Sequence, residues 1–170
     1  MVNELIGTMN KIEKWIVVKN DITYARLYVV KAAETIAKIE VVSNCQVPTR
    51  EAILQAEAIN PGLMSVFYRE PMSREMTEQE IRALLKKMDD YIQAHMEHVL
   101  NVANEYFGDG EIKTGTMIAN HFQTSMHFIY SVLDYLCNRG YMEKISQTIR
   151  ITPKSKLAVE EVAYIMPQPS

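Results

Sequence analysis

The chain has 170 residues, a formal net charge of −3 and apolar side chains at 48% of its positions. This composition can fill a hydrophobic core and excludes an intrinsically disordered chain, and the net negative charge does not favour binding to a polyanion. No apolar run is long enough to span a membrane, and the N-terminus lacks the basic start and long apolar segment of a secretory signal. We therefore predict a cytoplasmic protein with no membrane partner.

The two cysteines, Cys45 and Cys137, lie far apart in the sequence and form no Cys-x-x-Cys pair. In a cytoplasmic protein this pattern favours two reduced thiols over a disulfide or a metal site. We predict that both thiols are buried as small apolar side chains.

Residues 1–107 are predicted to be helical. Apolar residues of the first helix recur at helical spacing, at Leu5, Ile6, Met9, Ile12 and Ile16. The apolar positions of the second helix alternate steps of three and four, at Ile22, Ala25, Val29, Ala32, Ile36 and Ile39. This spacing is typical of a seam between packed helices, and its two alanines allow close approach. The seam is either buried within one chain or forms the interface of a homodimer.

A short helix over 49–58 is predicted to end at the breaker Asn60-Pro61-Gly62, with an apolar segment and a polar loop around Pro71 after it. The pattern Thr77-Glu78-Gln79-Glu80 is a capping box and predicts the start of the longest helix, from Glu78 to Phe107. The glycines around Asp109 would end this helix. We therefore predict a helical domain over 1–107 and a second domain over 108–170, of which the long helix is also a candidate first helix.

The second domain begins with a predicted strand over 111–115 and a helix from Thr116. Gln123-Thr124 predicts a tight turn. Ser125 is a good N-cap for the helix that follows, which is predicted to run to about Asn138.

Two short predicted strands, 141–145 and 148–152, flank Ser146-Gln147 as in a hairpin. Thr152-Pro153 then predicts the start of a final helix. The apolar side of that helix would be formed by Leu157, Val159, Val162 and Ile165.

Two stretches of the second domain are informative: Leu133-Asp134-Tyr135-Leu136-Cys137-Asn138-Arg139-Gly140-Tyr141 and Ile149-Arg150-Ile151-Thr152-Pro153-Lys154-Ser155-Lys156. They resemble the end of the recognition helix and the exit from the wing in winged helix-turn-helix regulators. The resemblance covers about residues 111–165. It implies a mainly α fold, in which an N-terminal helical bundle precedes a C-terminal winged helix-turn-helix with a small β-hairpin wing.

In that family the exposed side of the recognition helix enters the major groove of double-stranded DNA, and the wing touches the adjacent backbone. The resemblance therefore implies a set of nucleic-acid-binding residues: Ser125, His127, Tyr130, Arg139, Lys144, Arg150, Lys154 and Lys156. However, the first three turns of the helix contain no Arg or Lys, and Asp134 would repel phosphate. Residues 108–170 carry six basic and six acidic side chains. The cations are alternatively ordinary solvated charges, and a protein partner is an alternative to DNA.

The helical part contains the stretches Tyr24–Glu34, Pro48–Ala52 and Ile59–Pro61. They resemble the helical accessory domain that follows the catalytic domain in some nucleotidyltransferase-like proteins. A catalytic domain of that family needs a Gly-Ser turn and two carboxylates spaced Asp-x-Asp. This chain has no Gly-Ser pair, and its Asp89-Asp90 pair is adjacent, so the two side chains point in different directions from a helix. The resemblance therefore implies a noncatalytic portion.

No other pattern predicts catalysis. The sequence contains neither a phosphate-binding loop nor a nucleophile elbow. His95 and His98 could face one ion, but two ligands are too few for a zinc site, and His95 falls on an apolar stripe. We expect no metal and no cofactor. Five aromatic residues either line a pocket between helices or occupy the core and its rim: Trp15, Tyr24, Tyr28, Tyr68 and Tyr91.

The preferred hypothesis is a noncatalytic, dimeric protein that binds DNA or regulates transcription through its winged helix. One alternative is a winged helix that binds proteins. The other is the accessory, substrate- or partner-binding portion of a nucleotidyltransferase-like protein.

Overall fold

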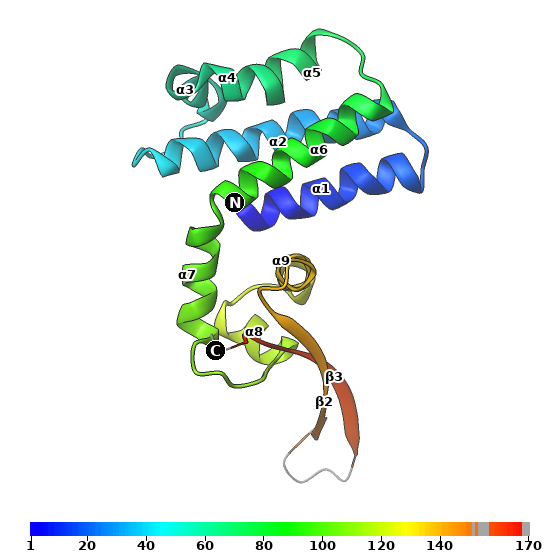
Figure 1. Ribbon diagram of the computed structural model, residues 1–170, viewed down its shortest axis with the longest axis vertical. Coiled ribbons are helices and arrows are strands. Elements are labelled where there is room, and N and C mark those ends of the chain that lie inside the picture. The colour runs from blue at the N-terminus through cyan, green and yellow to red at the C-terminus, as the bar shows by residue number, and fades with distance from the viewer. Residues whose placement is uncertain (151, 153–156, 168–170) are drawn as a thin grey trace. The chain divides into compact units, whose positions relative to one another are not determined.

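The computed structural model describes residues 1–150, 152 and 157–167, apart from the side chains of His98, His127 and Phe128 (Figure 1). The chain is mainly helical and has a small antiparallel sheet. It divides into two compact units, Met1–His95 and Met96–Ser170, which we call the helical unit and the mixed unit. The predicted domain boundary between residues 107 and 108 lies inside the mixed unit.

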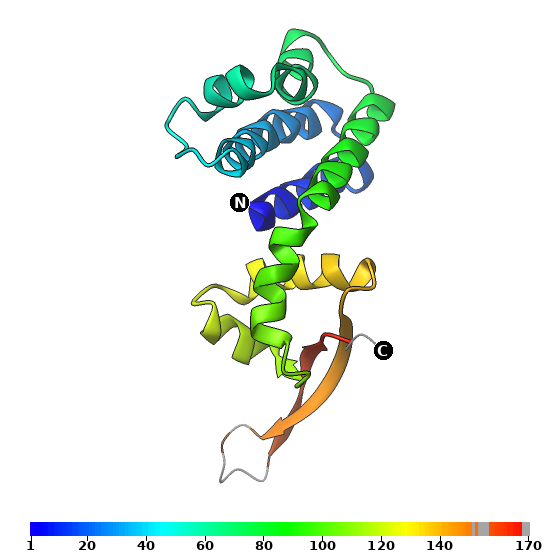
Figure 2. The same ribbon diagram turned by 60° about the vertical axis from the view of Figure 1, so that its left-hand side comes forward.

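The helical unit contains α1 (Val2–Val17), α2 (Ile22–Ser43), α3 (Ala52–Ile59), α4 (Pro61–Met64), the π-helical turn η1 (Ser65–Arg69), α5 (Glu70–Ser73) and α6 (Glu78–Ala94). The helix α2 lies between α1 and the segment from α3 to α5 in both views (Figure 1 and Figure 2), and it also contacts α6. The polar loop predicted around Pro71 is wrong, because Pro71 is a buried residue of α5.

The predicted seam of α2 forms the centre of the helical unit. Ala25, Val29, Ala32 and Ile36 are fully buried, and Ile39 is 6% exposed. The side chains pack within the chain, which explains their spacing without a second copy. A homodimer therefore stays a prediction, and this seam does not supply its interface.

The start of α6 confirms the predicted capping box. The Thr77 hydroxyl accepts a hydrogen bond from the Glu80 amide at 3.3 Å, and the Glu80 carboxylate accepts one from the Thr77 amide at 2.8 Å. Arg74 contacts the same carboxylate at 2.6 Å. The hydrogen bond from Arg74, followed by those from Thr77, lowers the pKa of Glu80 to about 2.

The single long helix predicted from Glu78 to Phe107 is wrong, because the helix is interrupted at His95. The imidazole Nδ1 of His95 donates to the carbonyl oxygen of Tyr91 at 2.8 Å, the acceptor that the His95 amide would use in a continuous α-helix. The His95 amide instead donates to Ile92. A side chain thus competes with the backbone for one carbonyl, which ends α6.

The mixed unit contains α7 (Met96–Phe107), β1 (Lys113–Thr114), α8 (Gly115–His121), α9 (Met126–Asn138), β2 (Glu143–Arg150) and β3 (Ala158–Ile165). The strands pair antiparallel in the order β1-β3-β2. Tyr164 of β3 is fully buried and packs in a core that also contains Phe107, Ile118, Ile129, Leu133, Leu136, Met142 and Ala163.

The predicted hairpin and the predicted final helix are both wrong. Ser146 and Gln147 do not form a turn but lie within β2, which runs without a break and pairs with β3 from Glu143 opposite Ile165 to Arg150 opposite Ala158. Of the residues assigned to a final helix, Ala158–Ile165 instead form the strand β3, and residues 153–156 lie outside the described part of the chain. The β-branched side chains of β3 favour an extended backbone once a neighbouring strand is present.

Two further expectations concern turns and thiols. Gly140 ends α9 with φ +76°, as the glycine in that position predicts. Both cysteines are free, but Cys45 is exposed and Cys137 is half-buried, so the prediction that both are buried is wrong. Cys45 lies in the turn after α2 with a positive φ, where its side chain faces solvent.

No helix in the described part of the chain is both long and apolar enough to cross a membrane.

Candidate functional site

The two described nucleic-acid-binding candidates at the start of α9, Ser125 and Tyr130, differ in exposure. Ser125 is exposed at the N-cap but makes no capping hydrogen bond through its side chain. Tyr130 is half-buried, and burial, followed by the negative charge of Glu161, raises the pKa of its phenol. The side chain of His127, together with Lys154 and Lys156, lies outside the described residues.

The predicted cations of the mixed unit differ in how they are engaged. The Lys144 ammonium donates to the Asp134 carboxylate at 2.8 Å, which raises the pKa of Lys144. The guanidinium of Arg139 lies 5.1 Å from the centre of the Tyr135 ring. The side chain of Arg150 is exposed and has no ion pair or hydrogen bond within the described chain. Of the three cations, only Arg150 has a side chain without such a contact among the described residues.

Asp134 joins three elements of the mixed unit. Besides Lys144 of β2, its carboxylate accepts a hydrogen bond from the Tyr164 hydroxyl of β3 at 3.3 Å. Burial, followed by the charge of Asp134, raises the pKa of Tyr164. The sequence identified Asp134 only as a residue that would repel phosphate, but it also links α9 to the sheet.

One face of the β2–β3 hairpin is polar and carries an acid at its centre. Ser146 donates to the Glu160 carboxylate at 2.6 Å, and Thr148 donates to the other oxygen of the same group. These two hydrogen bonds lower the pKa of Glu160, which therefore stays ionised. Because alternate residues of a strand share a face, this negative charge lies between Lys144 and Arg150. The arrangement opposes a continuous phosphate-binding surface on this face.

The helical unit carries a row of aromatic side chains at its surface. The rings of Trp15 and Tyr24 are 4.2 Å apart, and those of Tyr24 and Tyr28 are 5.9 Å apart. The ammonium of Lys11 lies 5.9 Å from the centre of the Tyr28 ring. The row therefore combines exposed aromatic surface with a nearby cation.

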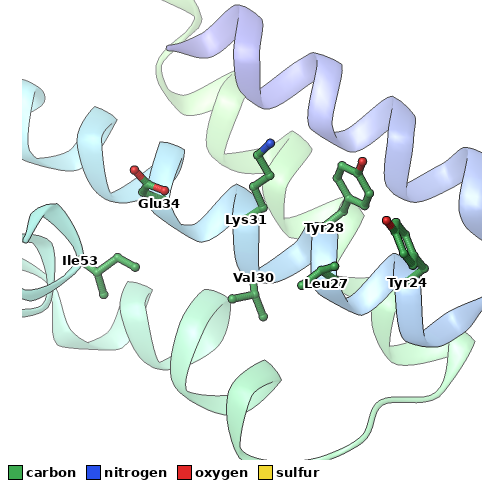
Figure 3. Close-up of a pocket in the computed structure, with 7 residues that line it drawn as sticks. All are labelled: Tyr24, Leu27, Tyr28, Val30, Lys31, Glu34 and Ile53. Carbon is green, nitrogen blue, oxygen red and sulfur yellow. The ribbon is translucent and has the colours of Figure 1, made fainter. Parts of the chain in front are cut away.

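Two of these tyrosines line a pocket of about 460 Å³, which we call the α2 pocket (Figure 3). Its lining residues come from α2 and α3: Tyr24, Leu27, Tyr28, Val30, Lys31, Glu34 and Ile53. The predicted aromatic pocket is thus found for Tyr24 and Tyr28, whereas Trp15, Tyr68 and Tyr91 do not line it.

Tyr91 instead takes part in a buried polar network that the sequence did not predict. Its hydroxyl donates to Glu40 at 3.0 Å, and the Asn60 amide donates to the other oxygen of Glu40 at 3.2 Å. Glu40 is 9% exposed. Burial, followed by the charge of Glu40, raises the pKa of Tyr91. A signal was present, because Glu40 follows Ile36 by four residues and so continues the apolar seam with a carboxylate.

His95 is half-buried, and its ring lies 4.4 Å from that of Tyr91, as expected for an interior histidine. Within the described residues, no group of three or more His, Cys, Asp or Glu side chains is placed to hold a metal ion. His98, the second histidine of the predicted pair, has a side chain outside the described set.

The fold is similar to that of a nucleotidyltransferase-like protein from Exiguobacterium sibiricum 255-15, known from a crystal structure. The TM-score is 0.70 at 17% sequence identity, and the match covers 96% of this chain and 56% of that chain. This chain therefore spans little more than half the length of that protein. No protein-family model and no curated protein matches the sequence. The predicted resemblance to nucleotidyltransferase-like proteins is supported at the level of the fold.

Proposed function

We propose that this chain is the noncatalytic, partner-binding portion of a nucleotidyltransferase-like system. The observation that carries the proposal is that 96% of the chain shares its fold with part of a nucleotidyltransferase-like protein. The absence of a Gly-Ser pair and the adjacent placement of Asp89 and Asp90 in α6 support a noncatalytic role. On this proposal, the nucleotidyl-transfer chemistry belongs to a separate catalytic domain.

We further infer that the mixed unit is a winged helix-turn-helix that binds a protein surface. Its support is the order of its elements: three helices, a short strand between the first two, and a hairpin after the third. A protein partner is favoured over DNA because Lys144 is paired with Asp134 and the ionised Glu160 lies on the same face of the hairpin.

The direct test of the proposal combines this chain with a catalytic domain. A domain with the Gly-Ser and Asp-x-Asp motifs, encoded beside this chain, would be purified and assayed for nucleotidyl transfer from radiolabelled ATP with Mg²⁺. We expect that adding this chain raises kcat/KM and that calorimetry detects a complex, whereas the chain alone transfers nothing. Transfer by the chain alone, or no complex and no change in kcat/KM, would overturn the proposal.

The DNA-binding alternative rests on the one exposed and unpaired cation among the described wing candidates, Arg150. Fluorescence anisotropy with mixed-sequence duplex DNA at low and moderate salt separates the two functions. Arg150→Glu is compared with Lys87→Glu, which makes the same charge change on the exposed surface of α6. We expect weak binding that both variants change equally. A steep salt dependence, lost only in Arg150→Glu, would instead establish a wing-anchored DNA reader.

A further inference from the structure

The α2 pocket combines an apolar wall with polar groups at its edge. In Figure 3, Val30 and Ile53 lie along one edge of the pocket, and Tyr28 and Lys31 lie along the other edge. Leu27 also lines the pocket and is 57% exposed. The pocket therefore presents accessible apolar surface that the chain itself does not cover.

Three donor groups along this pocket have no partner in the described chain: the hydroxyls of Tyr24 and Tyr28 and the ammonium of Lys31. Their spacing of four and then three residues places them on one face of α2. Each group is free to donate a hydrogen bond to a bound molecule.

The ionised groups of the pocket lining are Lys31 and Glu34. Glu34 is the single carboxylate of its lining, and the ammonium of Lys38 pairs with it at 2.7 Å. Lys31 has no such partner in the described chain, and the ammonium of Lys11 lies 5.9 Å from the centre of the Tyr28 ring. An anion near Lys31 would therefore be attracted, and a cationic ligand would be repelled.

The size of the pocket matches small ligands. Sites for small organic molecules enclose about 300–1,000 Å³ and combine mainly apolar walls with a few polar groups. At about 460 Å³ the α2 pocket lies within this range.

We propose that the α2 pocket binds a small amphipathic organic anion, with an aromatic or aliphatic body against Leu27, Val30 and Ile53 and a carboxylate, sulfonate or phosphate group against Lys31. The tyrosine hydroxyls supply further hydrogen bonds to the anionic group. The proposal goes beyond the proposed function and does not rest on it, so failure of one leaves the other standing.

The test uses two matched fluorescent probes that share a body and differ in charge. They are 8-anilinonaphthalene-1-sulfonate and neutral N-phenyl-1-naphthylamine. We expect saturable binding of the sulfonate at one site. Lys31→Glu should weaken binding of the sulfonate about tenfold, because it replaces a charge-assisted contact by repulsion. Binding of the neutral probe should change by less than about twofold, since its apolar contacts remain. The control Lys87→Glu should change neither probe.

The position of the probe is checked independently. In protein with ¹³C-labelled methyl groups, the sulfonate should shift the resonances of Leu27, Val30 and Ile53, and Ile53→Trp, which fills the pocket, should abolish binding of both probes. Circular dichroism confirms folding, and Lys31→Met serves if Lys31→Glu does not fold. Equal loss for the two probes in the Lys31 variant, equal loss in Lys87→Glu, or methyl shifts confined to other residues would each overturn the proposal.

Discussion

Two sets of polar side chains, one in each unit, differ in whether they have hydrogen-bond partners within the chain. In the mixed unit, Lys144, Asp134 and Tyr164 bond to one another and join a helix to two strands. On the outer face of α2 in the helical unit, Tyr24, Tyr28 and Lys31 have no such partners in the described chain. A cation in the sequence therefore does not by itself indicate a binding surface. What matters is whether the fold has already supplied its counter-charge.

Glu40 of the helical unit, unlike these three residues, is buried and hydrogen-bonded, and its replacement is expected to have the largest effect. Glu40→Ala leaves the Tyr91 hydroxyl and the Asn60 amide without their acceptor in a buried place. We expect the free energy of unfolding to fall by about 2–4 kcal/mol, measured by urea denaturation. Glu34→Ala, on the exposed face of the same helix, should cost less than about 1 kcal/mol. If both variants lose the same free energy of unfolding, the Glu40 network stabilises the fold no more than an exposed carboxylate does.

Two glycines, one in each unit, differ in how closely they are packed. A Cβ atom added at Gly115 would lie 2.5 Å from the Tyr130 hydroxyl oxygen and 2.7 Å from the Met126 methyl group, whereas one added at Gly7 of α1 would meet nothing within 4 Å. We expect Gly115→Ala to destabilise the fold by about 1–3 kcal/mol through overpacking of α8 against α9.

The same replacement at Gly7 should have the opposite sign. Gly7→Ala is expected to stabilise the protein by about 0.5–1 kcal/mol, because alanine restricts the unfolded chain and favours the helix. Thermal unfolding of Gly115→Ala and Gly7→Ala measures both changes in stability. A stable Gly115→Ala variant would mean that α8 and α9 do not approach each other as closely as the structure shows.

Much of the helical unit was predictable, because its signals are local. The capping box at Thr77 and the alternating seam of α2 each depend on residues within one or two helical turns. The mixed unit was less predictable, because its outcome depends on partners far along the chain. Val159, Val162 and Ile165 recur every three residues, which also fits a helix, and only the pairing with β2 decides for a strand.

The candidate sites also differ in how far the sequence predicted them. Aromatic residues in a possible pocket could be identified from their spacing, and Tyr24 and Tyr28 do line one. The availability of Lys144 could not be predicted, because its partner Asp134 is ten residues away on a different element. The break at His95 was also missed, because it depends on a side chain competing for one carbonyl oxygen.

A matched pair of lysine replacements measures the difference between the units directly. Lys144→Met removes the partner of Asp134 and should lower the free energy of unfolding by about 0.5–1 kcal/mol, as for a partly exposed ion pair. Lys31→Met removes no partner, so its effect should stay within about 0.5 kcal/mol. Chemical denaturation at neutral pH gives both values. A larger loss in Lys31→Met would show that Lys31 is engaged by the chain, which would remove the contrast.

The smallest effect is expected at Glu80, where a polar group of the helical unit is partnered but still partly exposed to solvent. Its pKa is about 2 in the folded chain, below the value of about 4.3 in an unfolded one. Its contribution to stability is therefore complete above about pH 4.5 and is lost as the pH falls towards 2. We expect the melting temperature of the native protein to fall more steeply between pH 4.5 and 2 than that of Glu80→Gln. Glu78→Gln makes an equal charge change at the first residue of the same helix. It should leave the dependence of the melting temperature on pH nearly unchanged. If the curves of the native protein and Glu80→Gln run parallel, the contact with Arg74 does not persist in solution, and the capping box acts through Thr77 alone.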